Sequence, residues 1–343
     1  MHKKVLFVSN SKRKFVNNHI LDAFIKRDDL SLNILHLLDD GFHESILDKI
    51  LIKLKIPPNY NNINESIISA VRKFRPDIVF VVKGNSIYPW TLRKIKKINC
   101  NIKLVSWSLD DMYAMHNRSL YYSYGLKFYD HVFTTKSYNI SELALIGAKD
   151  VHFLYQAYST WKHLNKDINA IRVPKRDVSF IGHAEKERFN SILHLAKHGI
   201  KVNIAGGGGW NKKTYTTAHK NISFQHQDLH GQDYCDFIAE SKINLCFLRK
   251  INRDLHTSRS IEIPASGGFM IAERTNEHET LFEDKKEAVY FNDNDDLLKN
   301  IQYYLSDKNE KERYRILKNG HQRCLINNYS YEDMVERILS VVA

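Results

Sequence analysis

Residues 256–273, HTSRSIEIPASGGFMIAE, decide the fold of this chain. The first part of the stretch predicts a short helix that begins near Ser258, because serine and threonine are favoured at helix N-termini. The pair Gly267–Gly268 then ends the helix. The apolar run 269–272 is typical of a parallel strand that is covered on both faces. The stretch therefore predicts one helix–strand step of an α/β fold.

The predicted helix carries the groups that a nucleotide-sugar ligand needs. Arg259 lies in its first turn, beside the free backbone N–H groups of the helix start, and both attract a diphosphate. Glu262 lies one turn beyond Ser258, near enough to accept hydrogen bonds from a ribose. Gly267 and Gly268 leave the backbone open to a ligand. All five residues are therefore candidates for binding a nucleotide-sugar donor.

The motif RxxEIPAxGGF at 259–269, followed by AERT at 272–275 and LFE at 281–283, resembles the group-1 glycosyltransferases. The resemblance is to the branch related to spore maturation protein CgeB, and it covers most of the C-terminal half. A weaker similarity lies at 110–111 and 129–134. The resemblance implies a GT-B enzyme with two Rossmann-like domains, of which the N-terminal one takes the acceptor and the C-terminal one takes the donor.

Family-4 relatives within this group carry two glutamates with seven residues between them. Glu262 matches the second glutamate, and Asp254 occupies the position of the first. The resemblance therefore makes Asp254 a candidate catalytic residue that contacts the donor sugar. It also implies a nucleoside-diphosphate sugar as co-substrate and no obligate metal, because arginine, lysine and helix-end amides can stabilise a departing diphosphate.

The length of 343 residues suits two domains, each able to bury its own core. No apolar run is long enough to span a membrane, and the N-terminus leads directly into a strand. We therefore expect no secretory signal and a cytoplasmic protein. The four cysteines lack any metal-ligand spacing, which agrees with reduced thiols in a bacterial-type cytosol. They are Cys100, Cys235, Cys246 and Cys324.

The formal net charge of +12 allows several interpretations. A solvated lysine-rich surface explains it without any partner, whereas an anionic membrane or a phosphorylated substrate would also favour it. The basic segments 12–14 and 93–97 could hold the N-terminal domain at the inner face of a membrane if the acceptor is lipid-linked. No nucleic-acid-binding signature is present, so we expect no nucleic acid partner.

The N-terminal half alternates apolar strands with amphipathic helices, which predicts a parallel, doubly wound sheet. Its strands are expected at 5–9, 32–38, 78–82, 103–107, 130–135 and 151–155. No Gly-x-Gly-x-x-Gly or Walker motif follows the first strand, which argues against a dinucleotide oxidoreductase and a P-loop kinase. The loops after the third and fourth strands should face the ligand, because ligands bind beyond the carboxyl ends of such strands.

The pair Asp110–Asp111 follows the fourth predicted strand and is a candidate for catalysis. One aspartate could contact the acceptor hydroxyl or remove its proton. The alternative is that one of them caps the next turn and the other is solvated. His116 is a further candidate base. The nearby aromatic residues could bind an acceptor or pack locally; they are Tyr121, Tyr122, Tyr124, Phe128 and Tyr129.

The second half restarts the alternation at 177–181, after a polar linker at 157–176. We expect an acceptor-side domain at 1–160 and a donor-binding domain at 177–328. A C-terminal helix follows at 329–343, and in the resembled fold it packs back on the N-terminal domain.

Several loops of the second half add candidate donor contacts. Gly182 and His183 directly follow a strand, and Gly182 would let the backbone approach the diphosphate. Lys186 and Arg188 on the next helix can neutralise charge, or they belong to an ordinary exposed helix face. The glycines at 206–209 form either a phosphate cradle or a flexible turn.

Two later loops complete the candidate donor site. Gln227, preceded by His226, follows the strand 221–225, where relatives of this fold hold the base. Arg249 lies in a charged loop after the strand 243–248.

The sequence therefore predicts an α/β protein of two Rossmann-like domains. We expect a glycosyltransferase that moves a sugar from a nucleoside-diphosphate sugar to a hydroxyl of a glycan, a lipid-linked glycan or a glycoconjugate. A nucleotide-sugar 2-epimerase of the same fold and a non-catalytic nucleotide-binding scaffold remain alternatives, since fold alone does not settle function.

Overall fold

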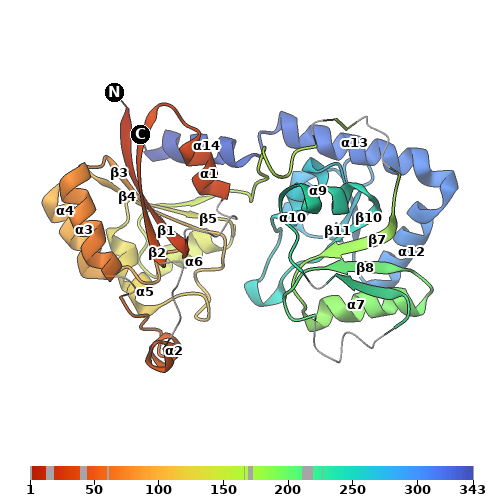
Figure 1. The fold of residues 1–343 in the computed structure, drawn as a ribbon, viewed down its shortest axis with the longest axis horizontal. Coiled ribbons are helices and arrows are strands. Elements are labelled where there is room, and N and C mark those ends of the chain that lie inside the picture. The colour runs from red at the N-terminus through yellow and green to blue at the C-terminus, as the bar shows by residue number, and fades with distance from the viewer. Residues whose placement is uncertain are drawn as a thin grey trace. The chain divides into compact units, whose positions relative to one another are not determined.

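The computed structural model describes residues 2–12, 19–38, 45–59, 62–165, 167–168, 173–210, 219–225 and 227–342. The chain divides into two compact units. The first contains Met1–Tyr155 and Tyr331–Ala343, and the second contains Gln156–Ser330. Within the described residues, each unit is built on one six-stranded sheet in which neighbouring strands are parallel. Helices cover both sheets (Figure 1).

The first sheet has the strand order β2-β1-β3-β4-β5-β6. Its strands are β1 (Lys3–Lys12), β2 (Leu30–Leu38), β3 (Ile78–Val82), β4 (Lys103–Ser108), β5 (His131–Thr134) and β6 (Val151–Phe153). The helices of this unit are α1 (His19–Ile25), α2 (Ile46–Lys53), α3 (Ile63–Phe74), α4 (Pro89–Ile98), α5 (Leu120–Gly125), α6 (Asn139–Leu145) and α14 (Tyr331–Val342).

Successive side chains of β1 point to opposite faces of the first sheet and contribute to the core on each face. Leu6 and Val8 point into the core beneath α3 and α4, whereas Phe7 points to the opposite face. There the ring of Phe7 lies 5.4 Å from that of Phe24 on α1 and 5.2 Å from that of Phe80 on β3. The C-terminal helix α14 packs against α1 and therefore belongs to the first unit.

The second sheet has the strand order β12-β11-β10-β7-β8-β9. Its strands are β7 (Arg176–Ile181), β8 (Val202–Ala205), β9 (Ile222–Gln225), β10 (Ser241–Cys246), β11 (Met270–Glu273) and β12 (Val289–Phe291). The helices are α7 (Lys186–Lys197), α9 (Gly231–Ala239), α10 (Arg259–Ala265), α11 (Asn276–Leu281), α12 (Asn294–Leu305) and α13 (Glu310–Ile326).

Both faces of the second sheet are buried. Side chains of α7 and α12 join the core on one face, and α10 packs against α13. Phe269 and the strand residues Met270, Ile271 and Ala272 are almost completely buried. This burial explains why the run 269–272 lacks polar alternation, as expected for a covered parallel strand.

The predicted fold class is confirmed, and each strand expected from an apolar run is present with its ends shifted by no more than a few residues. Helix α5 was not predicted. Among the described residues, no helix has the length and apolar character needed to cross a membrane.

Candidate functional site

The strand order of the second sheet marks the place where a ligand would bind. β7 has β8 on one side and β10 on the other, so the direction of winding reverses between β7 and β10. Ligands of open α/β sheets bind at such a point, beyond the carboxyl ends of the strands. The loop after β7 begins at Gly182, and the loop after β10 leads through Arg249 and Asp254 to the start of α10.

Two arginines lie near each other at this edge, Arg188 on α7 and Arg259 at the start of α10. Arg188 is only 4% exposed, and its guanidinium carbon lies 5.8 Å from the centre of the Phe180 ring. Burial lowers the pKa of Arg188 below its usual value, and the positive charge of Arg259 lowers it further, while Glu185 and Asp254 act in the opposite direction. Arg259 is partly buried, and two like charges that are shielded from solvent favour the binding of an anion between them.

The two guanidinium groups also keep hydrogen-bond donors unused. The Nε atoms of Arg188 and Arg259 are buried, and neither has an acceptor among the described residues. Arg188 Nη1 donates to the His183 carbonyl at 3.2 Å, and Arg259 Nη2 has a long contact of 3.5 Å with the Thr257 hydroxyl. Phosphate oxygens are good acceptors for such planar donor groups. The arginine pair therefore has the charge and the donors of a diphosphate site.

Glu185 connects the arginine pair to the rim of the site. One of its carboxylate oxygens lies 3.8 Å from Arg188 Nε, and the other accepts a hydrogen bond from Arg249 Nε at 3.0 Å. The Arg249 side chain is 51% exposed. Arg249 thus lies at the solvent-facing rim, and Glu185 offsets part of the positive charge.

The carboxylate of Glu262 lies in a nearly buried pocket. Its Oε2 accepts a hydrogen bond from the Tyr234 hydroxyl at 2.7 Å, and its Oε1 lies 3.7 Å from His163 Nδ1. Burial raises the pKa of Tyr234 well above its usual value, and the Glu262 charge adds to this effect, so the hydroxyl stays protonated and donates. Burial lowers the pKa of His163, against the opposing effect of Glu262. His163 Nδ1 accepts the Ser159 N–H at 3.1 Å, which fits a neutral ring.

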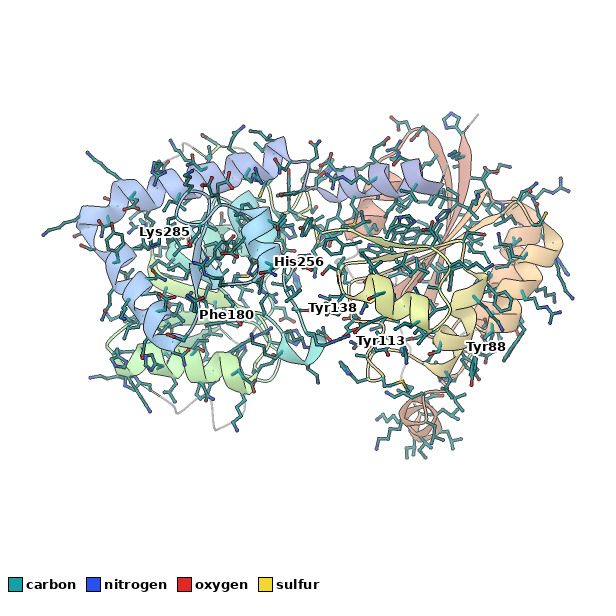
Figure 2. The ribbon with its side chains drawn as sticks, turned by 180° about the vertical axis from the view of Figure 1, so that it is seen from behind. Tyr88, Tyr113, Tyr138, Phe180, His256 and Lys285 are labelled. Atoms are coloured by element: carbon teal, nitrogen blue, oxygen red, sulfur yellow. The ribbon has the colours of Figure 1, made fainter. Side chains whose placement is uncertain are left out.

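The chain before α10 is held at His256, which is fully buried (Figure 2). Its Nδ1 bonds to the Glu277 carboxylate on α11, and its Nε2 accepts the Gln156 N–H at 2.9 Å. Because Nε2 accepts, Nδ1 carries the proton that is donated to Glu277. His256 thus ties the first residue of the second unit to the turn that precedes α10.

A second set of hydrogen bonds fixes the first turn of α10. Ser260 Oγ accepts the Thr257 N–H at 3.0 Å and lies 2.7 Å from His278 Nε2. His278 Nδ1 lies 2.6 Å from the Glu273 carbonyl, so Nδ1–H donates there and Nε2 accepts from the serine hydroxyl. Ser258 occupies the N-cap position, but its side chain makes no capping hydrogen bond. The expected cap is therefore replaced by the Ser260–His278 pair.

The glycines after β8 pack tightly against the loop after β7. A Cβ atom on Gly206 would lie 2.7 Å from the Gly182 carbonyl oxygen, and one on Gly208 would lie 2.5 Å from the His183 ring. The buried Trp210 donates from Nε1 to the Gly182 carbonyl at 2.6 Å. Gly182 N–H itself donates to the carbonyl of residue 205 at 3.0 Å, so this amide is not available to a phosphate. Gly206 and Gly208 therefore permit close packing of the two loops.

The expected donor contacts at Gly267 and Gly268 are wrong. Helix α10 starts at the carboxyl edge of β10 and runs antiparallel to the strands, so these glycines, which directly precede β11, lie at the amino edge. A Cβ on Gly268 would lie 2.4 Å from Ile238 Cγ2, and one on Gly267 would lie 2.6 Å from Asn165 Nδ2. Both glycines serve close packing and the positive φ of 76° at Gly267.

The remaining candidates of this unit lie nearer to solvent. Lys186 is exposed at the start of α7, in agreement with the ordinary helix-face alternative, whereas the buried Arg188 does not fit it. Gln227 is exposed beyond the end of β9. His226 lies outside the described residues. Asp254 is partly buried, and its N–H donates to the Arg249 carbonyl at 3.2 Å.

In the first unit, the two aspartates after β4 lie in different environments. Asp111 is fully buried, and its Oδ1 accepts the backbone N–H groups of 113 and 114 at 3.1 and 3.2 Å and the Asn139 amide at 2.9 Å. Asp111 is thus a turn cap, and its expected catalytic role is not supported. Asp110 is partly exposed and pairs with Lys83, which follows β3, at 2.6 Å. Asp110 is the aspartate that a ligand at this edge can reach.

The aromatic residues near α5 form two groups. Tyr122 and Tyr129 belong to the core, which agrees with the packing alternative. Tyr121 instead joins Tyr88 and the exposed Trp90, with ring centres 4.7 Å and 5.8 Å away. Two members of this second group lie at the start of α4, and Figure 2 labels one of them, Tyr88.

Sequence reasoning missed Glu185, Tyr234, His163 and the buried position of Arg188. Only Glu185 had a local signal, because it lies three residues before Arg188 at the start of a predicted helix. Tyr234 and His163 reach Glu262 from distant parts of the chain, and the sequence contains no sign of these contacts.

Residues 186–340 match the family model described as "Glycosyl transferase-like". A search of curated proteins finds no match. The matched segment includes the arginine pair, Glu262 and the whole motif at 259–269. The match confirms the predicted enzyme class, a glycosyltransferase.

Solved structures with the same fold span the whole chain. The Anabaena protein HepE in complex with UDP and glucose has 14% sequence identity and a TM-score of 0.65, covering 99% of this chain and 100% of that one. Sucrose-phosphate synthase from Thermosynechococcus elongatus has 11% identity and a TM-score of 0.68, covering 99% and 98%. A UDP-N-acetylglucosamine 2-epimerase, described as putative, from Listeria monocytogenes has 12% identity and a TM-score of 0.57, covering 100% and 96%. The chain thus has the GT-B fold, and its residues 186–340 match a glycosyl transferase-like family model.

Proposed function

We propose that this chain transfers a sugar from a nucleoside-diphosphate sugar to a hydroxyl of a glycan, a lipid-linked glycan or a glycoconjugate. The observation that carries the proposal is the pair Arg188 and Arg259, two neighbouring guanidinium groups with unused donors where β7 and β10 end. The HepE structure contains UDP and glucose, which are ligands of the proposed class. The motif at 259–269 further supports membership of the CgeB-related branch.

In the proposed reaction, the acceptor oxygen attacks the anomeric carbon while the bond from that carbon to the diphosphate oxygen breaks. The electron pair of the broken bond stays with the departing nucleoside diphosphate. Arg188 and Arg259 bind the diphosphate and stabilise its growing negative charge. Since two guanidinium groups supply this charge, we propose that transfer has no obligate metal, and we expect activity to persist in the presence of a chelator.

Glu262 is proposed to accept hydrogen bonds from the ribose. Its Oε2 is held by Tyr234, which leaves Oε1 for a ligand hydroxyl. Asp254 is proposed to contact the donor sugar, because it lies close enough to Arg188 for its charge to act on that guanidinium. Arg249, at the exposed rim, is proposed to assist the diphosphate without being enclosed with it.

The first unit is proposed to take the acceptor, and the second unit the donor. Asp110 is the candidate base, because it is partly exposed beyond the carboxyl end of β4 and its pairing with Lys83 holds it at the ligand-binding edge. The removal of a proton by a carboxylate would then accompany attack by the acceptor hydroxyl.

A thermal-shift screen of nucleoside diphosphates, their sugars and the free nucleosides tests the donor class. Ligands that bind the folded protein raise its melting temperature by mass action. We expect the diphosphates and nucleotide sugars of one base to stabilise the wild type and to lose this effect in Arg259→Ala. Arg315→Ala, on the exposed face of α13, is the matched control and should respond like the wild type. Stabilisation by no phosphorylated ligand would refute the proposal.

The reaction type is tested by incubating the donor without any acceptor. A 2-epimerase would convert the donor into a second nucleotide sugar, whereas a glycosyltransferase leaves the sugar unchanged or releases it by slow hydrolysis. A new nucleotide sugar in chromatography would favour the epimerase. Donor binding without turnover of any acceptor would favour the scaffold alternative.

We further propose that the first unit contacts an anionic membrane, and helix α2 supports this proposal. None of the residues of α2 is buried, and the exposed apolar side chains of α2 and of its C-cap residue form a stripe in which the members are four residues apart or adjacent. The stripe consists of Ile46, Leu47, Ile50 and Leu54. Lys49 and Lys53 lie beside it, as in helices that lie flat at a membrane surface. Figure 1 shows α2 apart from the sheet of its unit.

The earlier basic segments contribute less to this proposal. Residues 13 and 14 lie outside the described residues. In the segment 93–97, Lys96 is already paired with Asp130 at 2.6 Å. Vesicle sedimentation at low salt should recover the wild type with anionic but not neutral vesicles, and the double variant Ile46→Glu/Ile50→Glu should stay in solution. Leu145→Glu, at another exposed apolar position, is the matched control. Equal recovery of both variants would refute a role for α2.

A further inference from the structure

Three side chains at the edge of the first sheet converge on one point that no substrate role explains. His131 opens β5, Asp150 directly precedes β6, and His152 is the middle residue of β6. His131 Nδ1 and His152 Nε2 each lie 2.8 Å from the same carboxylate oxygen, Oδ2 of Asp150. One ligand atom from each of the three residues lies within 4.8 Å of the others.

The backbone holds these side chains on one face of the sheet. Phe133 pairs with His152 in the parallel register of β5 and β6, and the Val132 N–H donates to the Asp150 carbonyl at 2.8 Å. Because side chains alternate along a strand, His131 and Phe133 share a face, as do Asp150 and His152. The His152 ring stacks on Phe133 with 5.0 Å between ring centres, which limits its rotation. The strands β5 and β6 therefore position His131 and His152, and Asp150 lies directly before β6.

We propose that His131, Asp150 and His152 form an accessory site for one divalent transition-metal ion of the zinc type. Two imidazoles and one carboxylate, with an open position for water, are a common donor set for such ions. Rotation of the Asp150 side chain would free the point on which both nitrogens converge, and metal–ligand distances of about 2.0–2.2 Å then require small ring movements. The Asp150 carboxylate is 47% exposed, so an ion can enter from solvent.

The donor types indicate which class of ion the cluster would bind. Histidine and carboxylate together prefer zinc-type ions over magnesium, which takes oxygen ligands.

The position of the cluster separates this site from the proposed transfer reaction. His131 and Asp150 lie at the amino ends of β5 and β6, whereas ligands of such sheets bind at the carboxyl ends. A bound ion would crosslink the edge strand β6 to β5. We therefore expect it to stabilise the first unit without taking part in sugar transfer.

Calorimetry of chelator-treated protein at pH 7.5 with zinc chloride tests the site. We expect one tight zinc site in the wild type, no magnesium site, and a loss of zinc affinity of at least tenfold in both His152→Ala and Asp150→Asn. A melting curve of each variant without metal shows that it is folded. His116→Ala, an exposed histidine of the same unit, is the control and should bind like the wild type.

The partly exposed His194 on α7 and the exposed His198 directly after it supply a second control, because their rings lie 4.5 Å apart in the other unit. If zinc binding is lost in His194→Ala and kept in His152→Ala, the ion binds elsewhere and the proposal is wrong. Absence of a tight zinc site in the wild type, or zinc binding that is unchanged in both His152→Ala and Asp150→Asn, would overturn it equally. None of these readouts depends on glycosyl transfer.

Discussion

Replacing Tyr234 by phenylalanine tests the buried pocket of the candidate donor site. The substitution removes one oxygen atom, which donates to Glu262 Oε2 at 2.7 Å. The ring keeps its place, including its contact with His163 at 5.2 Å between ring centres. The change therefore takes a hydrogen bond away from a nearly buried carboxylate and leaves the packing almost unaltered.

The expected cost follows from the charge and burial of the acceptor. Hydrogen bonds to charged groups contribute about 1.5–3 kcal/mol to stability, and removing one partner leaves the other poorly solvated. For a unit of this size, each kcal/mol shifts the melting temperature by about 2–4 °C. We therefore expect Tyr234→Phe to melt about 3–12 °C below the wild type. Ribose-containing ligands should also bind more weakly, because Tyr234 no longer orients Glu262.

Chemical unfolding of the wild type, Tyr234→Phe, Glu262→Gln and the double variant measures the coupling between the two side chains. Tyr303→Phe is the matched control, because Tyr303 donates to Glu312 at 2.9 Å on the exposed surface. The control should unfold close to the wild type, since exposed pairs contribute little. If Tyr234→Phe unfolds like the control, or if the two substitutions are additive, the reasoning about this pocket is refuted.

Three further predictions concern the roles of single residues. Asp110→Asn should reduce transfer about 10²–10⁴-fold with unchanged melting, whereas Asp111→Ala should lower the free energy of unfolding by about 1–3 kcal/mol through the loss of its turn cap. A transfer assay and a melting curve on each variant separate the two effects, and full activity of Asp110→Asn would remove Asp110 from the mechanism. Gly268→Ala should lower the free energy of unfolding, measured by chemical unfolding, by about 1–3 kcal/mol, because the added Cβ would meet Ile238. The donor affinity of the folded protein should stay the same. Weaker donor binding without loss of stability would contradict the packing role. Burial lowers the pKa of His278 to about 4. The unfolded chain therefore binds more protons than the folded one between pH 6.5 and 4, and the fold loses stability as the pH falls through this window. The melting temperature of His278→Gln should decline less steeply than that of the wild type from pH 7 to 4.5, and equal declines in the two proteins would argue against this effect.

Much of the fold could be predicted because its strands are buried on both faces. The run 78–82, for example, is continuous and apolar, and the structure gives it the predicted bounds. Helix α5 was missed because LYYSYG is short and rich in tyrosine, so it lacks the apolar periodicity of a helix. The position of α14 in the first unit depends on tertiary packing against α1, and only the resemblance suggested it.

The candidate site could be predicted only in part. The position of Arg259 follows from a local signal, the start of a helix after a buried strand. The burial of Arg188 depends on the Phe180 ring beneath it, and the cap on Asp111 depends on Asn139, which is far along the chain. The error at Gly267 and Gly268 has a simple cause: a helix that begins at the carboxyl edge of a sheet ends at the amino edge, away from the ligand.

Calorimetric titration of nucleoside diphosphate into the wild type, Arg259→Ala and Arg315→Ala tests the central claim most directly, with free nucleoside as the comparison ligand. The account predicts that Arg259→Ala weakens diphosphate binding about 10- to 150-fold, which corresponds to about 1.5–3 kcal/mol for a charge-assisted contact. Nucleoside binding should change little, and Arg315→Ala should bind both ligands like the wild type. Equal diphosphate affinity in the wild type and Arg259→Ala would contradict the assignment of the arginine pair as the donor diphosphate site.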